Sequence, residues 1–321
     1  EMNSLIGDAF HWTMPVKSVE APGTRDENGP QGLTASLLGN DKSQLTATAF
    51  TSEDVMAATF NTEIMTEIGK VIGNNCLEAD IACLYGPGNN IHRTPYGGRN
   101  FEYYSEDGVL SGAMASNAIM GAQEQGVYAF MKHFALNDQE TNRYGMLCTW
   151  STEQAIREIY LRPFEISVKD ADCHAVMSSF NYIGNCWAGG CSELLKNVLR
   201  GEWGFVGFVE TDYFGVYGYM TADQGVRNGS DLMLCTTGND FNTVTVLTNS
   251  SKQAMRTSAK NILYTVVNSR AYDEENLNPG MPGWEKVMIG VDVVLAAALI
   301  ALEVLVVKKG YAKRKEEEVN A

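Results

Sequence analysis

Apolar positions between residues 52 and 268 follow two alternating patterns. Short apolar runs, typical of buried strands, lie at 81–85, 126–134, 174–179, 205–211 and 232–235. Segments with helical spacing lie at 52–75, 106–124, 151–169, 192–202, 221–228 and 252–268. Strands that alternate with helices favour a parallel sheet with crossover helices. A closed barrel and an open doubly wound sheet fit this pattern equally well.

The pattern changes after residue 272. Residues 273–286 are rich in Asn, Pro and Gly, which predicts a linker. Residues 287–307 are almost wholly apolar and, as a helix, would cross a hydrocarbon core of about 30 Å. Residues 308–321 form a tail that is first basic and then acidic. Basic residues favour the cytoplasmic side, so we expect a single-pass cell-membrane anchor that holds residues 1–272 outside the cell.

Two acidic residues argue against the membrane span. Asp292 and Glu303 lie within the apolar segment, and each would cost a few kcal/mol near the bilayer centre. An amphipathic or packed soluble helix is therefore the alternative. Both residues lie several positions from the middle of the segment, and they share one helix face that could meet a partner helix.

Composition excludes several classes of function. The net charge of −15, from 24 basic and 39 acidic residues, would repel a phosphate backbone, so nucleic acid is not an expected partner. Neutral sugars remain possible ligands. The seven cysteines are scattered without a CxxC pair, which predicts free thiols rather than a zinc site. No GxGxxG loop follows a strand, so no cofactor or metal is implied.

Polar residues gather where four predicted strands should end, and in a parallel barrel those ends carry catalysis. The segments are ENGPQGL at 27–33, GPGNNIHRTPYGGRNFEYYSED at 86–107, KHFALNDQETNR at 132–143 and GFVETDYFG at 207–215. Asp212 falls near the end of the last run, since an unpaired Asp would be costly inside the strand core. Glu210 precedes it by two positions and should face the same side of the strand.

Together these four segments resemble glycoside hydrolase family 3, over about residues 7–272. The resemblance implies a (β/α)8-like TIM barrel, possibly with missing or irregular strands. It also implies a retaining, exo-acting β-glucosidase that releases terminal β-linked glucose from oligosaccharides or glycosides through a covalent glycosyl-Asp intermediate. Retention requires two carboxyl groups about 5–5.5 Å apart. A β-xylosidase of the same family, or a glycan-binding module without activity, is the alternative.

The resemblance assigns roles to five residues. Asp212 matches the family's nucleophile, and Arg99, Lys132 and His133 match its binders of sugar hydroxyls. Adjacent strand residues point to opposite faces, so Lys132 and His133 can both reach the sugar only if the strand end is irregular. Tyr213 stands where the family often has Trp and could form an apolar wall for the sugar ring.

Two positions depart from the family pattern. Asn28 stands where the family usually has an Asp that binds the sugar's far hydroxyls, and an amide lacks the stronger charge-assisted bond. Phe180 stands where many members have Tyr, so one hydroxyl is lost near the nucleophile. KHFALND also lacks the His-bearing loop of the family's N-acetylglucosaminidases, which argues against amino sugars.

The general acid is the missing component. In β-glucosidases of this family it usually comes from an α/β-sandwich domain, which cannot fit in the roughly fifty residues after Tyr272. Because the chain opens at Glu1 without Met, we expect a permuted member whose sandwich domain lies upstream. Glu210 is the local rival, because a Glu beside the Asp212 carboxylate would have a raised pKa. The alternative for Glu210 is an ion pair with a barrel Lys or Arg.

Overall fold

A computed structural model describes residues 1–7, 11–34, 47–213, 218–235, 241–272 and 283–320. The chain divides into two compact units, Glu1–Asp273 and Glu274–Ala321, which are described separately.

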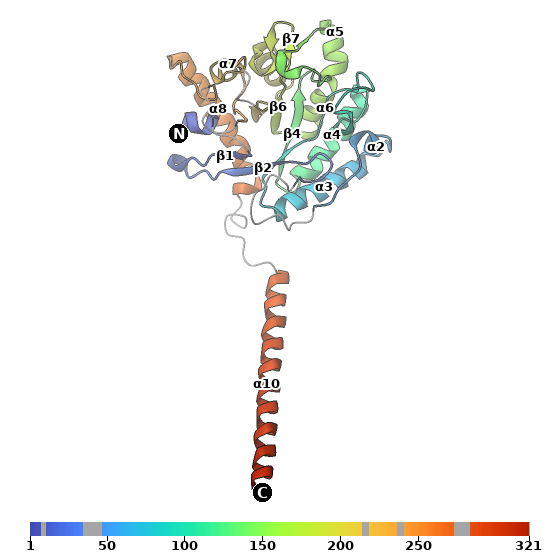
Figure 1. The fold of residues 1–321 in the computed structure, drawn as a ribbon. Helices are drawn as coiled ribbons and strands as arrows, with labels where there is room; N and C mark the ends of the chain where they lie inside the picture. The colour runs from blue at the N-terminus through green and yellow to red at the C-terminus, as the bar shows by residue number, and fades with distance from the viewer. Residues whose placement is uncertain (8–10, 35–46, 214–217, 236–240, 273–282, 321) are drawn as a thin grey trace. The chain divides into compact units, whose positions relative to one another are not determined.

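Six strands of the first unit form one sheet, in the order β1-β2-β3-β4-β6-β9 (Figure 1). Their bounds are β1 Trp12–Thr13, β2 Thr24–Asn28, β3 Cys83–Tyr85, β4 Tyr128–Phe134, β6 Ala175–Ser178 and β9 Phe208–Glu210. β1 pairs antiparallel with β2, and every later neighbour is parallel. The predicted parallel sheet is therefore confirmed.

The sheet forms part of a TIM-type barrel rather than a full ring of eight strands. Beyond β9, the predicted strand at 232–235 forms isolated bridges rather than a continuous strand, among them a parallel bridge between Glu210 and Leu232. Met233 then donates a backbone hydrogen bond of 2.8 Å to Ile6, in α1 (Met2–Gly7). The N-terminal segment thus lies where a further strand would continue the ring, in agreement with the expectation of missing strands.

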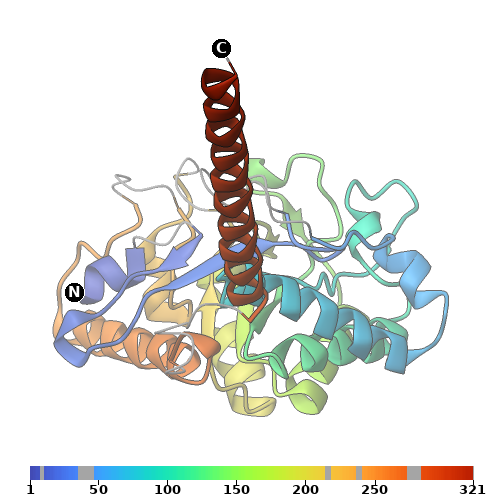
Figure 2. The same cartoon turned by 90° about the horizontal axis from the view of Figure 1, so that it is seen from below.

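Helices lie in sequence between the strands. They are α2 Glu53–Ala57, α3 Thr62–Glu78, α4 Gly108–Gln123, α5 Glu153–Ala155, α6 Arg162–Ala171, α7 Ala222–Asn228 and α8 Asn249–Val267, with the π-helices η5 Ile156–Tyr160 and η7 Glu193–Glu202. Short 3-10 turns lie at Lys17–Val19, Asn100–Glu102, Arg143–Gly145, Ala188–Gly190 and Arg270–Tyr272. α3 packs on α4 and α4 on α6, outside the sheet (Figures 1 and 2). A second small sheet joins β5 Cys148–Thr149, β7 Tyr182–Ile183 and β8 Cys186–Trp187.

The prediction of one helix over 52–75 is wrong, because the segment forms two helices. α2 ends at Ala57, and Phe60 adopts a φ of 51°, which no helix continues through. Asn61 then caps α3, since its side chain accepts hydrogen bonds from the amides of Glu63 and Ile64 at 3.0 and 3.1 Å. An Asn that satisfies two free amides favours a helix start over a helix interior.

Replacing this cap should destabilise the protein measurably. We expect Asn61→Ala to lower the free energy of unfolding by about 1 kcal/mol, because two helix amides lose their acceptor. Ser52→Ala is the matched control, since Ser52 occupies the N-cap of α2 without a side-chain capping bond. Urea unfolding followed by circular dichroism measures both changes. Equal losses for the two variants would contradict the capping assignment.

Alternating strand residues separate two faces of the sheet. On the inner face, Phe130 packs against Tyr85 and Phe208 with ring centroids 5.3 and 5.1 Å apart. On the outer face, Val176 and Val209 pack in the cluster that includes α6 residues. Because the side-chain period is two, Glu210 shares the inner face of β9 with Phe208. Asp212 follows Glu210 by two residues, just beyond the end of β9.

The second unit contains one long helix, α10 Gly283–Val319. It extends further at both ends than the predicted span of 287–307. Within it, Lys286–Lys315 is long and apolar enough to cross a membrane, and none of this stretch is buried inside the unit. Residues 273–282 of the predicted linker lie outside the described residues. Its last four residues, 283–286, belong to α10.

Candidate active site

The carboxyl ends of the parallel strands meet at one edge of the sheet and bring the predicted site residues together. Lys132 and His133 lie near the carboxyl end of β4. β2 ends at Asn28, and Asp212 follows β9 by two residues. Phe180 follows β6 in the same way. Residues from distant parts of the sequence therefore share one edge, as parallel topology requires.

β4 ends irregularly, as the predicted roles of Lys132 and His133 require. Its pairing with β6 shifts register between Met131 and Phe134, and the Lys132–His133 peptide is cis. Asn90 holds the His133 backbone on both sides: its Oδ1 accepts from the amide at 2.7 Å, and its Nδ2 donates to the carbonyl at 3.0 Å. Both Lys132 and His133 reach site carboxylates as a result.

Glu102 links two of the predicted sugar binders. It is buried, it accepts a hydrogen bond from Nε of Arg99, and its Oε2 lies 3.3 Å from Nζ of Lys132. Burial alone would raise the pKa of Glu102, but Lys132 and Arg99 overcome this and hold it at about 2. The sequence motifs included Glu102 in the polar segment 86–107 without a role. Its position inside that segment, next to Arg99, is the signal that could have found it.

Close backbone approach makes this ion-pair cluster possible. Gly88 bridges in parallel to both Tyr103 and Lys132, so the chain beside Glu102 lies against the end of β4. A Cβ on Gly88 would collide with the backbone carbonyl oxygen of Glu102. Only glycine therefore fits between these two segments.

Asp212 is the buried carboxylate at the centre of the site. Its side chain accepts a hydrogen bond of 2.7 Å from the amide of Tyr213, and its Oδ2 lies 3.7 Å from Nε2 of His133. Burial raises the pKa of Asp212, while Arg143 and Arg99 oppose that rise. Burial also lowers the pKa of His133 well below its usual value, so the imidazole is neutral near pH 7. Asp212 thus lies among several donors and cations.

Arg143 is a site residue that the sequence motifs did not single out, although it ends the segment 132–143. Its guanidinium lies 4.7 Å from the ring centroid of Phe180 and 4.7 Å from that of Tyr144. It also acts electrostatically on Asp212. Phe180 is buried, so it serves as a platform under Arg143. Phe180 packs in this way without the hydroxyl that a Tyr at this position would carry.

Glu210 is fully buried on the inner face of the barrel. The alternative that it pairs with a barrel Lys or Arg is wrong, since the described residues contain no such ion pair. Burial and the neighbouring carboxylates of Asp26 and Asp212 raise its pKa well above the usual value, against a smaller opposing effect of Tyr85. These effects favour the protonated form of the Glu210 carboxyl.

Asn28 and Tyr213 occupy the rim of the same edge. Asn28 is half-buried and pairs in register with Tyr85. Its backbone N–H donates to Oε1 of Glu27 at 2.8 Å. Tyr213 is half-buried and packs against the inner core cluster. Among the described residues, no group of three or more His, Cys, Asp or Glu side chains could hold a metal ion.

Comparison with known proteins places this geometry in a family. Residues 34–256 match the model of the glycosyl hydrolase family 3 N-terminal domain. β-Glucosidase B of Emericella nidulans is 37% identical over 232 residues, which are 72% of this chain and 27% of that protein. A β-glucosidase of Ruminococcus albus is 42% identical over 160 residues, which are 50% of this chain and 17% of that protein.

Solved structures agree with this match. β-Glucosidase 3B of Thermotoga neapolitana, in complex with glucose, is 35% identical with a TM-score of 0.75, covering 89% of this chain and 43% of that one. The β-glucosidase of Kluyveromyces marxianus, also with glucose, is 28% identical with a TM-score of 0.75, covering 84% and 32%. The chain spans about a quarter of the length of the curated relatives that it matches over most of its own length. The family model covers well over half of the chain, and the chain therefore belongs to glycosyl hydrolase family 3.

Proposed function

We propose that this chain is the nucleophile-bearing part of a retaining, exo-acting β-glucosidase. The observation that carries the proposal is Asp212, a carboxylate at the carboxyl end of β9 with Arg143, Arg99 and Lys132 acting on it. These cations oppose the effect of burial and so favour the ionised form that a nucleophile needs. The relatives, which are β-glucosidases, favour glucose over xylose as the terminal sugar.

In the proposed reaction, a carboxylate oxygen of Asp212 forms a bond to the anomeric carbon of the terminal glucose. The glycosidic bond breaks, and its electron pair goes to the leaving oxygen, which takes a proton from a general acid. Water then attacks the anomeric carbon of the glycosyl-Asp212 ester and gives its proton to the deprotonated acid, and the bond that breaks restores the Asp212 carboxylate. Two inversions give net retention.

The general acid is proposed to come from outside the barrel unit. A general acid must approach the leaving oxygen to hydrogen-bond distance. Glu210 has the raised pKa of an acid, but it is 0% exposed and faces the barrel interior next to Tyr85 and Asp26. It therefore supports the fold of the inner face rather than proton transfer to a substrate.

Sugar binding is proposed to use the ion-pair cluster and the rim. Lys132 and Arg99, oriented by Glu102, present donors to the sugar hydroxyls, and neutral His133 presents its ring nitrogen. Asn28 would contact the far hydroxyls from the end of β2, and Tyr213 would cover one face of the ring.

Covalent trapping tests the proposed nucleophile. We expect a 2-deoxy-2-fluoroglucoside with a dinitrophenol leaving group to label the protein at Asp212, because such a leaving group needs little protonation. Peptide mass mapping after proteolysis locates the label. A label on Glu210 or on any other carboxylate would overturn the assignment. The corresponding fluoroxyloside, used in parallel, reports whether the site prefers the sugar that carries the C6 hydroxymethyl group.

We also propose that α10 anchors the protein in the cell membrane with the barrel unit outside. The helix exposes Leu299, Ile300 and Val294, each more than 60% exposed, to its surroundings. Lys308, Lys309 and Lys313 follow the apolar stretch and favour the cytoplasmic side.

Membrane fractionation tests the anchor. We expect the full chain to stay with membranes after alkaline carbonate, and a chain truncated before Gly283 to be released, because burial of the apolar stretch is worth far more than surface adsorption. Full-length protein in the carbonate wash would exclude the span. Protease added to intact cells should digest the barrel unit; digestion of the tail alone would reverse the proposed orientation.

A further inference from the structure

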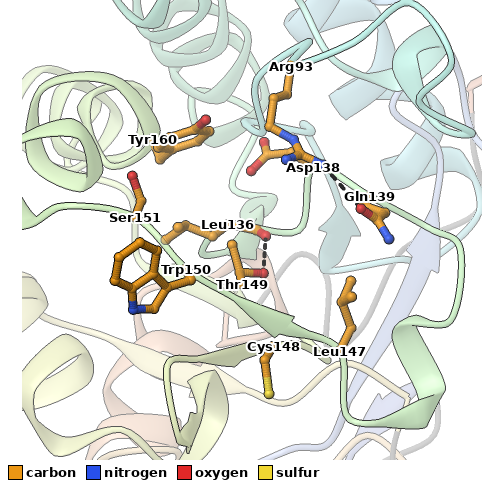
Figure 3. A pocket seen from close by; sticks show the side chains of 10 residues that line it. All are labelled: Arg93, Leu136, Asp138, Gln139, Leu147, Cys148, Thr149, Trp150, Ser151 and Tyr160. Carbon is orange, nitrogen blue, oxygen red and sulfur yellow. Dashed lines mark hydrogen bonds between the residues drawn. The ribbon is translucent and has the colours of Figure 1, made fainter.

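The structure contains a further pocket of about 290 Å³ (Figure 3). Its walls come from the loops after β3 and β4, from β5 and from η5. The lining includes Arg93, Asp138, Gln139, Cys148, Trp150 and Tyr160. The predicted nucleophile and sugar binders are absent from this lining. Neither the sequence motifs nor the proposed reaction accounts for this pocket.

The pocket has one aromatic side and one polar side. Trp150 and Tyr160 lie on one side, and Arg93, Asp138 and Gln139 on the other (Figure 3). The Trp150 side chain is 84% exposed, an unusual position for the largest apolar side chain. A Trp left open beside a polar wall is typical of a recognition site rather than of a core.

The polar wall is fixed in place by the same segments that hold the proposed catalytic residues. Nη2 of Arg93 donates to Oε1 of Gln139 at 3.1 Å, and the amide of Ile91 donates to Oδ1 of Asp138 at 2.8 Å. Asp138 is 7% exposed, so a buried carboxyl faces the pocket from a rigid position. Ile91 directly follows Asn90, which cradles His133. The pocket and the site of Asp212 are therefore built on the same two loops.

The chemistry of the lining selects a ligand class. The net charge of the chain is −15, which disfavours an anionic ligand. An apolar ligand would cover the remaining donors and acceptors of Arg93, Asp138 and Gln139 without giving them hydrogen-bond partners. A neutral sugar has an apolar ring face for Trp150 and hydroxyls for the opposite wall. We propose that this pocket is a second carbohydrate-binding site, which holds one glucosyl unit of a β-linked oligosaccharide outside the catalytic site.

Cys148 offers a readout of this pocket alone. It is exposed and lines the pocket, whereas Cys186, which is partly exposed, lies outside the lining. We expect cellotetraose to slow the labelling of Cys148 by N-ethylmaleimide at least threefold and to leave the labelling of Cys186 unchanged. Peptide mass spectrometry measures both rates in the full chain. The Asp212→Asn variant is used, so that hydrolysis of the ligand does not enter the result.

Substitution of the aromatic wall completes the test. We expect Trp150→Ala to abolish the protection of Cys148 and Trp150→Tyr to retain part of it, since a phenol ring still offers a stacking face. Trp12→Ala, at a tryptophan that is 40% exposed on β1, should leave protection intact. Because Trp150 is so exposed, its removal should not affect folding, and circular dichroism checks this.

Three results would overturn the proposal, and the first two are no protection of Cys148 by cellotetraose at millimolar concentration and protection that survives in Trp150→Ala. Protection by an unrelated peptide equal to that by cellotetraose would also overturn it. None of these readouts depends on the covalent labelling of Asp212. Failure of this second site and failure of the proposed nucleophile are therefore separate outcomes.

Discussion

Replacing Asp212 with Asn should lower kcat for an aryl β-glucoside by on the order of 10⁴- to 10⁶-fold. An amide is a far weaker nucleophile than a carboxylate, and no second carboxylate among the described site residues is placed to form the glycosyl intermediate. Glu210, the nearest candidate on the same strand, is buried, and burial raises its pKa well above the usual value. Steady-state kinetics with 4-nitrophenyl glucoside, on the protein in its active form, measures the loss.

The same variant should not lose stability. Burial raises the pKa of Asp212 above that of the unfolded chain, even though Arg143 and Arg99 oppose the rise. A raised pKa means that the ionised carboxylate costs folding free energy at pH values above its folded pKa, and that this cost disappears below its unfolded pKa. The Asp212→Asn substitution would remove the cost, so the melting temperature should stay equal or rise. A large drop in melting temperature would indicate that Asp212 is mainly structural.

Glu210→Gln is the matched control for the kinetic loss. A protonated, buried Glu and a Gln carry the same charge and nearly the same shape, so kcat should change by less than about tenfold. A loss as large as that of Asp212→Asn would return Glu210 to the reaction. Comparison of the two variants thus separates the roles of two acidic residues on one strand face.

The strands could be predicted because a strand that is buried on both faces appears in the sequence as a short continuous run of apolar residues. The apolar run at 174–179 contains β6, and the run at 126–134 contains β4. The break between α2 and α3 was missed, because apolar spacing continues across Phe60 while the capping bonds of Asn61 start a new helix. A local side-chain hydrogen bond outweighed the periodic pattern there.

The candidate site could also be predicted from the sequence only in part. The motifs located Asp212, Lys132 and His133, since each lies directly at a strand end. Motifs could not show that Glu102 bridges Arg99 and Lys132, because Lys132 is distant in sequence and meets Glu102 only through the close approach at Gly88. Contacts between distant segments depend on the fold, and one sequence carries no direct signal of them.

Removing the Glu102 charge should destabilise the protein, in contrast to removal of the Asp212 charge. We expect Glu102→Gln to lower the free energy of unfolding at pH 7 by about 3 kcal/mol, since it leaves the buried Lys132 and the half-buried Arg99 without their shared partner. The pKa of Glu102, about 2 against an ordinary 4.5, corresponds to a similar energy. Burial lowers the pKa of Lys132 despite the ion pair, so part of this energy offsets the desolvation of the ammonium group.

The sign of the pH dependence follows from the depressed pKa. Glu102 contributes stability that is fully present above about pH 4.5 and is lost as the pH falls toward its folded pKa of about 2. The difference in unfolding free energy between the parent and Glu102→Gln should therefore shrink as the pH falls below about 4.5. Urea unfolding at a series of pH values measures this difference.

Two controls separate the buried cluster from ordinary ion pairs. Glu67→Gln removes an exposed partner of Lys70, and because water screens that pair, the unfolding free energy should stay within the scatter of repeat measurements. Glu53 is buried beside the cluster, and burial together with the charge of Glu102 raises its pKa well above the usual value, which favours its neutral form in the parent protein. Once Glu102 is neutral, Glu53 can ionise and partly replace it. The double variant Glu53→Gln/Glu102→Gln should therefore lose more stability than the sum of the single variants; strict additivity would contradict the proposed electrostatic coupling of these carboxyls through Lys132 and Arg99.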